Sequence, residues 1–526
     1  MRRRDFLKLS APVAVLPFVW NGLYMTAYGR SRFIDKVFQT AVETDRVFVL
    51  LQMSGGNDGL NTVIPLDQYG AYQAARSNIA IPESSLQATK LSDATALHPA
   101  MTDMKALFDA GMLAVVQGVS YPNPNFSHFR ATDIWLTAAD YDEYLESGWL
   151  GRYLDYEYPG FPSGYPTQSV PDPVAIQISS VVLNALQGLT TSTGTAITNP
   201  NGSFLAPAEQ GQPPNTLAGA QVAYIRAVDL QTQKYSTVVK TAYNAAQNKS
   251  TKYPTTGQNP LADQFAIVAR LIAGGLQTRV YVVNIGGFDT HSSQVTDTDP
   301  TLGTHAKLLG NLSVAMGAFM DDLNLLGLSN RVVGMTFTEF GRRIKSNASY
   351  GTDHGTSEPI FIFGSSINGG LYGVNPLLPS NATVQDNLGL QYDFRQVYSS
   401  VLAEWFGAGA DELNSTLQRQ FSTLPIFNGL TESNNQTTPG EFQLYQNYPN
   451  PFNPSTIIQY QIPKPQHVTI RIYDELGREI TTLVDTDQSA GIHTVDFDAR
   501  GLASGVYFYR IETPTIRDTK KMIYAK

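Results

Sequence analysis

The sequence predicts an α/β domain with a mostly parallel central sheet and flanking helices, followed by a small all-β sandwich. From residue 46 onward, short apolar runs alternate with longer stretches of helical periodicity, which is typical of βαβ units. After residue 441 the period changes to two, and the short segments are separated by Gly, Pro and Asp turns. The 526 residues suffice for one large core and an appended module, since single cores stop growing near about 250–300 residues.

The strands of the first domain are predicted from apolar runs of the kind that parallel sheets bury on both faces. These runs are residues 47–53, 113–119, 174–179, 279–285, 331–337 and 359–363. Apolar residues at three- and four-residue steps predict a helix around residues 308–323 and another over 393–406. A further helix is expected over 217–247, between polar loops at 189–216 and 248–260.

Composition excludes several classes of protein. The net charge is -9, only 15% of residues are charged, and no basic block occurs, so nothing indicates nucleic-acid binding. The chain has no cysteine, which excludes disulfides, thiolate zinc ligands and a cysteine nucleophile.

The N-terminus predicts export. Arg3 and Arg4 precede Phe6, Leu7 and Lys8, and an apolar run follows over residues 9–20. This pattern resembles a twin-arginine signal peptide, here assigned to residues 1–30, which implies the twin-arginine export machinery as a partner. An ordinary basic signal or a membrane anchor is the alternative, but the run is shorter than the roughly 20 residues that a span needs. No other apolar stretch is long enough, so we expect no transmembrane span in the mature protein.

Five polar clusters are expected just past the C-terminal ends of predicted buried strands, at residues 54–59, 125–128, 286–291, 338–342 and 351–355. In open α/β sheets this edge is where ligands bind. Carboxylates, imidazoles and one hydroxyl brought to one edge predict a metal or acid/base site. The candidate metal ligands are Asp58, Asp289, His291, Glu339, Asp353 and His354, and the candidate catalytic residues are Ser127, His128 and Arg342.

Several of these residues have a second interpretation. Asp58 either points into the crevice or caps the helix that follows it. Ser127 opens a predicted helix, where it is either a nucleophile at the positive end of the helix dipole or only an N-cap. Glu339 either binds a metal or pairs with Arg342 or Arg343.

The two Asp-His pairs are more specific. Asp289 and His291 are one residue apart after a double glycine, and Asp353 and His354 are adjacent, so each pair can reach one ion from a turn. The other histidines are interpreted differently. His98 and His305 are expected to be structural, and His467 and His493 belong to the C-terminal module.

The order of these motifs resembles the alkaline phosphatase and sulfatase superfamily. More specifically, residues 54–61, 127–129, 288–291, 339–342 and 351–355 resemble the exported bacterial family called domain of unknown function 1501. The resemblance covers roughly residues 40–410 and implies an alkaline-phosphatase-like domain, assigned to residues 40–427. It further implies one or two divalent ions, such as zinc, manganese or magnesium.

In this resemblance, Asp58, Ser127, Asp353 and His354 match one metal site and the nucleophile. Asp289 and His291 would match the other metal site. Two departures put one site in doubt, since only one residue separates Asp289 from His291 where the superfamily has three. In addition, no histidine follows His354 in this domain.

The C-terminal module follows a polar linker at residues 428–441 and is assigned to 442–526. It resembles the type A sorting domain of the type IX secretion system, with Asn-Tyr-Pro-Asn-Pro-Phe-Asn-Pro-Ser-Thr at 447–456 and Leu-Ala-Ser-Gly-Val-Tyr at 502–507. This implies the type IX machinery as a partner, passage through the periplasm, and a final location at the cell surface or outside the cell. The alternative is a generic adhesive or carbohydrate-binding sandwich.

These observations together predict an exported metal-dependent hydrolase of phosphate or related esters, with Ser127 as nucleophile. Its partner would be a small-molecule or polymer ester. The competing hypothesis is a non-catalytic surface or secreted binding protein that retains the phosphatase-like fold.

Overall fold

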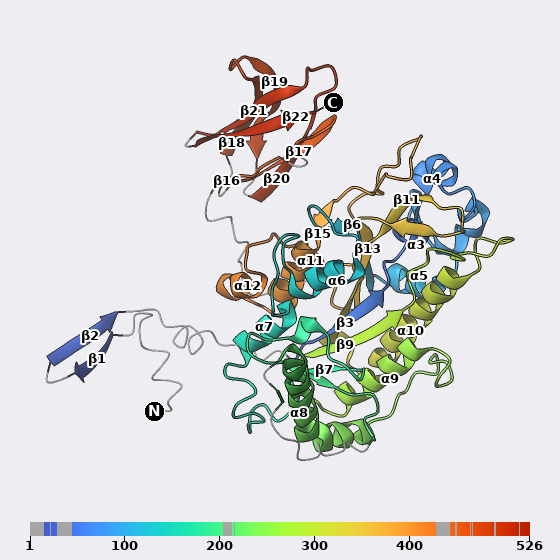
Figure 1. The fold of residues 1–526 in the computed structure, drawn as a ribbon, viewed down its shortest axis with the longest axis vertical. Helices are drawn as coiled ribbons and strands as arrows, with labels where there is room; N and C mark the ends of the chain where they lie inside the picture. Colours follow the sequence, from blue (N-terminus) through green and yellow to red (C-terminus); the bar gives the residue numbers. More distant parts are fainter. Residues whose placement is uncertain are drawn as a thin grey trace. The chain divides into compact units, whose positions relative to one another are not determined.

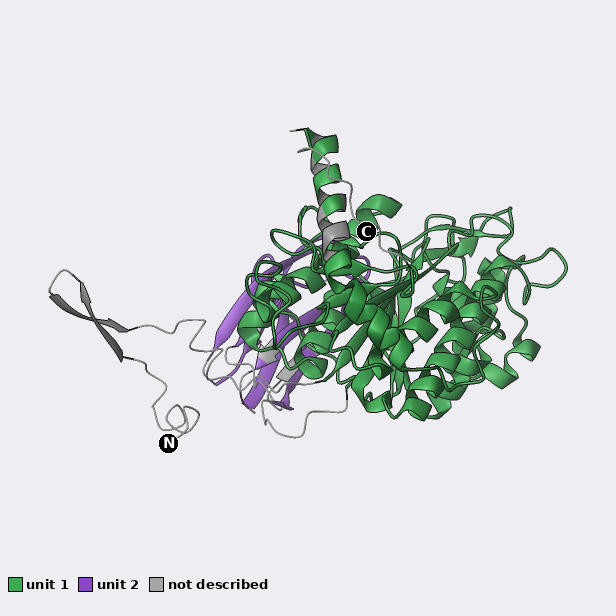
Figure 2. Ribbon diagram, turned by 90° about the horizontal axis from the view of Figure 1, so that it is seen from below, with its two compact units in different colours: residues 1–429 green, residues 430–526 purple. Residues whose placement is uncertain are grey.

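The computed structural model describes two compact units, Met1–Gly429 and Leu430–Lys526 (Figure 2). The described residues are 45–202, 213–214, 216–427 and 442–525 except 448–449, 463, 465, 489–490 and 515, together with a hairpin of β1 (Val15–Trp20) and β2 (Leu23–Tyr28). The rest of the predicted signal peptide at 1–30, with its twin arginines, and the predicted linker at 428–441 lie outside the described residues.

The first unit is built on a nine-stranded sheet in the order β14-β6-β13-β10-β3-β9-β7-β8, with β15 beside β6 (Figure 1). All neighbouring pairs are parallel except the two that β13 makes with β10 and β6. The prediction of an α/β domain with a mostly parallel sheet is therefore confirmed. The strands are β3 (Val47–Ser54), β6 (Leu113–Ser120), β7 (Ala175–Gln177), β8 (Gly194–Ala196), β9 (Val280–Gly286), β10 (Val332–Phe337), β13 (Glu358–Gly364), β14 (Gly370–Tyr372) and β15 (Tyr392–Asp393).

The direction of β13 changes how one motif reaches the site. Its start, Glu358, pairs with Val119 near the end of β6, whereas its last residue, Gly364, pairs with Val333 at the start of β10. The segment before β13 therefore lies at the edge where the parallel strands end. Asp353 and His354 reach that edge by preceding a strand, and not by following one as the sequence had led us to expect.

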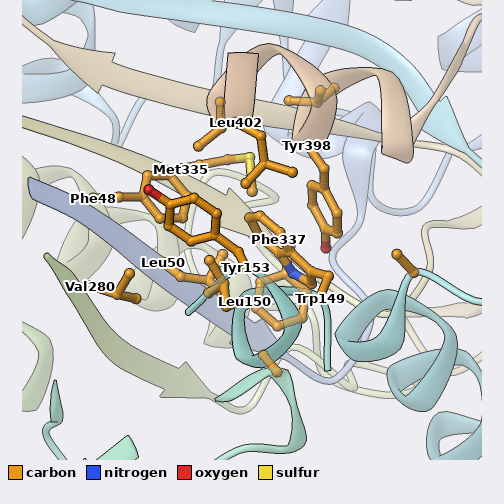
Figure 3. Close-up of a cluster of buried hydrophobic side chains, with 14 of the residues drawn as sticks. Phe48, Leu50, Trp149, Leu150, Tyr153, Val280, Met335, Phe337, Tyr398 and Leu402 are labelled. Carbon is orange, nitrogen blue, oxygen red and sulfur yellow. The ribbon is translucent and has the colours of Figure 1, made fainter. Parts of the chain in front are cut away.

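Side chains of β3 alternate between two cores because successive residues of a strand face opposite sides. Phe48 and Leu50 belong to one core, and Val49 and Leu51 to the other. Helices α6 (His128–Thr137), α7 (Trp149–Glu157) and α11 (Phe394–Ser400) contribute to the first core, and α5 (Thr102–Asp109), α9 (Pro260–Ala273) and α10 (Thr304–Leu326) to the second. The first core includes several large aromatic residues, and Trp149 stacks on Tyr398 with ring centroids 4.2 Å apart (Figure 3).

The remaining helices are α3 (Gly59–Thr62), α4 (Tyr69–Ala75), α8 (Leu217–Ala245) and α12 (Ala410–Leu417). Two small antiparallel sheets, β4 (Val63–Pro65) with β5 (Thr95–Leu97) and β11 (Arg342–Ser346) with β12 (Thr352–His354), lie outside the main sheet. The helix predicted over 393–406 changes at its end, since Val401–Trp405 forms a π-helical turn after α11. Within the described part of the chain, no helix is long and apolar enough to cross a membrane.

The second unit contains two antiparallel sheets around its own core of Ile458, Ile470 and Tyr509, among others. One sheet has the order β16-β17-β20 and the other β19-β18-β21-β22. The all-β prediction for this part is confirmed. Its strands are β16 (Gln443–Leu444), β17 (Ser455–Ile462), β18 (Gln466–Asp474), β19 (Glu479–Gln488), β20 (Gly491–Asp498), β21 (Gly505–Glu512) and β22 (Arg517–Tyr524).

Candidate metal centre

Three segments far apart in sequence bring titratable side chains together at the carboxyl edge of the sheet. Asp289 and His291 follow β9, His128 is the first residue of α6, and His354 ends β12. His128, Asp289 and His354 each offer a ligand atom, and these atoms lie within 4.8 Å of one another. The structure thus contains a His/Asp group that could hold a metal ion.

The carboxylate of Asp289 is the centre of this group. Its Oδ2 lies 3.6 Å from Nε2 of His128, and its Oδ1 lies 3.1 Å from Nε2 of His291 and 3.4 Å from Nε2 of His354. In a tetrahedral zinc site, bonds of about 2.0–2.1 Å place neighbouring ligand atoms roughly 3.3 Å apart. The distances from the three imidazoles to the carboxylate of Asp289 are close to this spacing. His291 is not part of the group of three, but it contacts both Asp289 and His354.

Each imidazole presents Nε2 because its Nδ1 faces an acceptor. Nδ1 of His354 lies 2.8 Å from the carbonyl oxygen of Phe126, which can only accept, so Nδ1 carries the proton and Nε2 keeps its lone pair. Nδ1 of His128 lies 2.8 Å from Oε1 of Glu339, and Nδ1 of His291 lies 3.4 Å from Oδ1 of Asp353. Acceptors behind the ligating histidines are the usual arrangement around protein-bound metals.

His291 and His354 are also in direct contact with each other. Their Nε2 atoms are 2.8 Å apart, a distance at which two nitrogen lone pairs repel unless a proton or a cation lies between them. Burial, and then the charge of Arg342, outweighs the hydrogen bond to Phe126 and lowers the pKa of His354. A neutral imidazole is the form that binds a metal.

Glu339 is held rigidly behind His128. Its two carboxylate oxygens accept the N–H of Gly55 at 3.0 and 3.1 Å, and Oε2 also accepts the hydroxyl of Thr338 at 3.1 Å. Gly55 has a φ of +124°, and a Cβ there would lie 2.4 Å from the backbone nitrogen of Asp289, so only glycine permits this approach. The sequence predicts Glu339 either as a metal ligand or as the partner of Arg342 or Arg343, whereas in this structure its carboxylate faces Nδ1 of His128.

Arg342 lies beneath the cluster and is fully buried. Its Nη2 donates to Oδ1 of Asp289 at 2.7 Å. Burial alone would raise the pKa of Asp289, but this hydrogen bond and the arginine charge outweigh it and lower the pKa. The guanidinium also donates, at 2.5–3.2 Å, to four backbone carbonyls, those of Gly55, Gly56, Phe288 and Thr352. These contacts suit a residue that positions the loops and Asp289.

Asp58 lies in a separate buried ion pair. Nη1 of Arg76 lies 2.7 and 2.6 Å from its two oxygens, and Nε2 of Gln294 donates to Oδ2 at 2.6 Å. Burial alone would raise the pKa of Asp58, but the charge of Arg76 and these hydrogen bonds lower it. Its side chain makes no cap hydrogen bond to α3. In this structure Asp58 therefore does not cap α3, and Arg76 and Gln294 engage its carboxylate oxygens; its predicted role as a metal ligand stays a prediction.

Gln294 joins the two segments that carry Asp289, His291 and His354. Its Oε1 accepts the hydroxyls of Thr290 and Thr352, both at 3.0 Å, while its amide holds Asp58. Thr290 lies between Asp289 and His291, and Thr352 directly precedes the second Asp-His pair. Sequence reasoning missed Gln294, Arg76 and the carbonyl of Phe126, because neither a lone glutamine or arginine nor a backbone acceptor leaves a recognisable motif.

Ser127 is exposed and occupies the N-cap position of α6. Its hydroxyl makes no cap hydrogen bond, and its backbone N–H donates to Oδ1 of Asn125 at 2.8 Å. The side chain is therefore not engaged as the helix cap that was weighed as its alternative role.

The whole chain was compared with known proteins. A family profile described as "Protein of unknown function (DUF1501)" matches residues 45–415, and the chain belongs to this family. A profile described as "Secretion system C-terminal sorting domain" matches residues 446–525, which indicates export to the cell surface or the extracellular space. No curated protein matches the chain significantly.

The solved structures that match this chain include the following three. The PsFucS1 sulfatase from Pseudoalteromonas sp. is 9% identical over 86% of this chain and 84% of its own, with a TM-score of 0.32. A protein in the alkaline phosphatase superfamily from Vibrio parahaemolyticus is 8% identical over 83% and 82%, with a TM-score of 0.32. PorZ, a surface component of the type IX secretion system of Porphyromonas gingivalis, is 20% identical over 19% of this chain and 14% of its own, with a TM-score of 0.13.

Proposed function

We propose that this protein is an exported metal-dependent hydrolase of phosphate or related esters. One divalent ion would be held by His128, Asp289, His291 and His354. The observation that carries the proposal is the convergence of three Nε2 atoms on the carboxylate of Asp289, at 3.1–3.6 Å.

The donor set supports some metals over others. Three imidazoles and one carboxylate suit zinc and other transition metals, whereas magnesium prefers oxygen ligands. Zinc is therefore the leading candidate among zinc, manganese and magnesium. An ion at this position would supply positive charge that polarises the ester and favours the deprotonated form of a nucleophile.

The chain itself would supply the nucleophile and the orientation of the ligands. Ser127 has an exposed hydroxyl at the positive end of the α6 dipole, next to His128, and this position favours an alkoxide. Glu339 would keep the proton of His128 on Nδ1. Arg342 would orient Asp289, and Asp353 would orient His291.

Asp58 is left out of the proposed ligand set because Arg76 and Gln294 engage its oxygens. Glu339 and Asp353 are placed behind the ligands, since each faces the Nδ1 of a histidine. His128, which the sequence predicts as a catalytic residue, is proposed here as a metal ligand.

The test combines metal analysis with hydrolysis of p-nitrophenyl phosphate, bis-p-nitrophenyl phosphate and p-nitrophenyl sulfate. We expect close to one tightly held ion per chain and turnover of at least one ester. Asp289→Asn should lose both the ion and the activity, because an amide is a much poorer ligand. Ser127→Ala should keep the ion and lose the activity. Ser163→Ala, at an exposed serine in a turn, is the matched control.

Two results would overturn parts of this proposal. Protein that holds the ion but hydrolyses none of these esters, under any metal supplied, would be a binding protein that retains the fold. Ser127→Ala protein with unchanged turnover would exclude Ser127 as the nucleophile while leaving the metal site intact.

A further inference from the structure

A pocket of about 560 Å³ opens between the carboxyl end of β3 and the helix α6. It adjoins the candidate metal centre, because His128, Asp289 and Glu339 line it. A substrate whose ester group reached the metal would extend into this space. The other lining side chains therefore indicate what the rest of the substrate is.

Two elements, β3 and α6, contribute mostly neutral side chains to the lining of the pocket. On β3, Phe48 and Leu50 face the first core. Because every second residue of a strand lies on the same face, Gln52 and Ser54 share that face, and both line the pocket. Along α6, Phe129, Thr132 and Leu136 recur at steps of three and four residues and thus share one helix face. Asn184 also lines the pocket.

Gln52 gives the strongest indication of a ligand. The residue is 8% exposed, and its carboxamide has no hydrogen-bond partner among the residues that the structure describes, so its polar atoms face the solvent-accessible pocket. A carboxamide that faces an open pocket can exchange its hydrogen bonds to water for hydrogen bonds to a ligand. Because this one lines the pocket, a hydroxyl or similar polar group of a ligand is the partner that it can reach.

The charges of the pocket exclude other classes of ligand. No Lys or Arg is among the described residues that line it, so no permanently cationic side chain faces a second anionic group there. Its three carboxylates already have partners: Asp133 has Arg130 at 2.5 Å, Asp289 has Arg342 at 2.7 Å, and Glu339 has His128 at 2.8 Å. Asp133 and Glu339 are thus paired, and the proposed metal ion would occupy Asp289, so no carboxylate is left for an ammonium group and an uncharged ligand fits best.

Phe129 adds an apolar surface to these polar groups. Its side chain is 91% exposed, although it lines a pocket in which it could pack against a ligand. A sugar ring presents hydroxyls at its edge and C–H bonds on its faces, which matches a carboxamide and an aromatic ring on one pocket. We propose that the pocket binds the alcohol portion of the substrate, and that this portion is a neutral sugar or a similar polyol. The assignment of this portion as part of a substrate rests on the proposed hydrolase function.

The experiment measures equilibrium binding by saturation-transfer difference NMR. The probes are a panel of methyl hexopyranosides as neutral ligands, choline as a cation and inositol hexakisphosphate as a polyanion. We expect at least one methyl hexopyranoside to bind and the other two to bind at least tenfold more weakly. Gln52→Met keeps the side-chain volume, removes the hydrogen bonds and should weaken hexopyranoside binding about five- to tenfold.

Further variants separate a specific pocket from a general surface effect. Phe129→Ala should weaken hexopyranoside binding about three- to tenfold. Gln73→Met, at an exposed glutamine on α4, is the matched control and should change nothing. The proposal is overturned if no hexopyranoside binds, if choline or inositol hexakisphosphate binds more tightly, or if Gln52→Met leaves binding unchanged.

The same titration on the Asp289→Asn protein keeps this proposal distinct from the proposed function. Hexopyranoside binding that persists without metal or turnover supports the pocket even where the hydrolase proposal fails. Metal binding and ester hydrolysis without any hexopyranoside binding overturn the pocket assignment alone.

Discussion

The substitution Asp58→Asn tests whether Asp58 is a member of a buried ion pair or a metal ligand. Asp58 and Arg76 are both fully buried, with nitrogen and oxygen 2.6 Å apart. The substitution keeps the shape but leaves the guanidinium without its counter-charge, which costs about 3–5 kcal/mol when one member of a buried pair is removed. We therefore expect the free energy of unfolding, measured by urea denaturation, to fall by about this amount.

The matched control is Asp45, which pairs with Arg331 at 2.6 Å but has a side chain that is 68% exposed. Asp45→Asn should cost less than about 1 kcal/mol, because water screens a surface pair. Metal content provides the second readout. Folded Asp58→Asn protein should bind zinc with nearly wild-type stoichiometry, whereas Asp289→Asn protein should not.

The opposite pattern would refute this reasoning. If Asp58→Asn abolishes metal binding while costing no more stability than Asp45→Asn, then Asp58 is a ligand. The pairing with Arg76 would in that case contribute little, and the sequence-based assignment of Asp58 to the metal would be restored.

Two further predictions concern the surroundings of the centre. Gln294→Leu removes the shared acceptor of Thr290 and Thr352, so zinc affinity should fall about 10–100-fold by competition with a chelator, as for other residues behind metal ligands. The affinity would stay unchanged if Gln294 only filled space. Burial and the neighbouring histidine lower the pKa of His98 to about 3, and burial lowers that of His305 to about 4. Both pKa values lie below the value of ~6.5 for a histidine in the unfolded chain. As the pH falls below about 6.5, the unfolded state therefore takes up protons that the folded state does not, and the free energy of unfolding decreases. Urea denaturation should show a loss of about 2 kcal/mol for each histidine between about pH 6.5 and 5. A flat profile, or an equal slope in His98→Gln protein, would contradict this prediction.

Much of the secondary structure was predictable from the sequence because it depends on local pattern. The apolar runs at 47–53, 113–119 and 279–285 became β3, β6 and β9 with ends shifted by one residue at most. Helical periodicity placed α10, and the change to period two placed the antiparallel sheets of the second unit. The direction of β13 was not predictable, since an apolar run reads the same in either orientation.

The site was predictable as a set of residue types and not as a set of roles. Sequence motifs singled out Asp289, His291 and His354, and the structure places them together with His128. They did not separate these residues from Asp58, because an aspartate after a glycine-rich turn looks the same whether it faces an ion or an arginine.

By itself, then, the sequence determined the α/β class, the C-terminal sorting domain and the polar motifs at one edge of the sheet. Those features depend on the order and spacing of residues along the chain. Only the tertiary structure decided which partners each motif has: Arg76 for Asp58, Glu339 for His128, the carbonyl of Phe126 for His354. These partners are 18 to 228 residues away in the chain, and hydrogen bonds of this kind depend on distances and angles that exist only once the chain is folded.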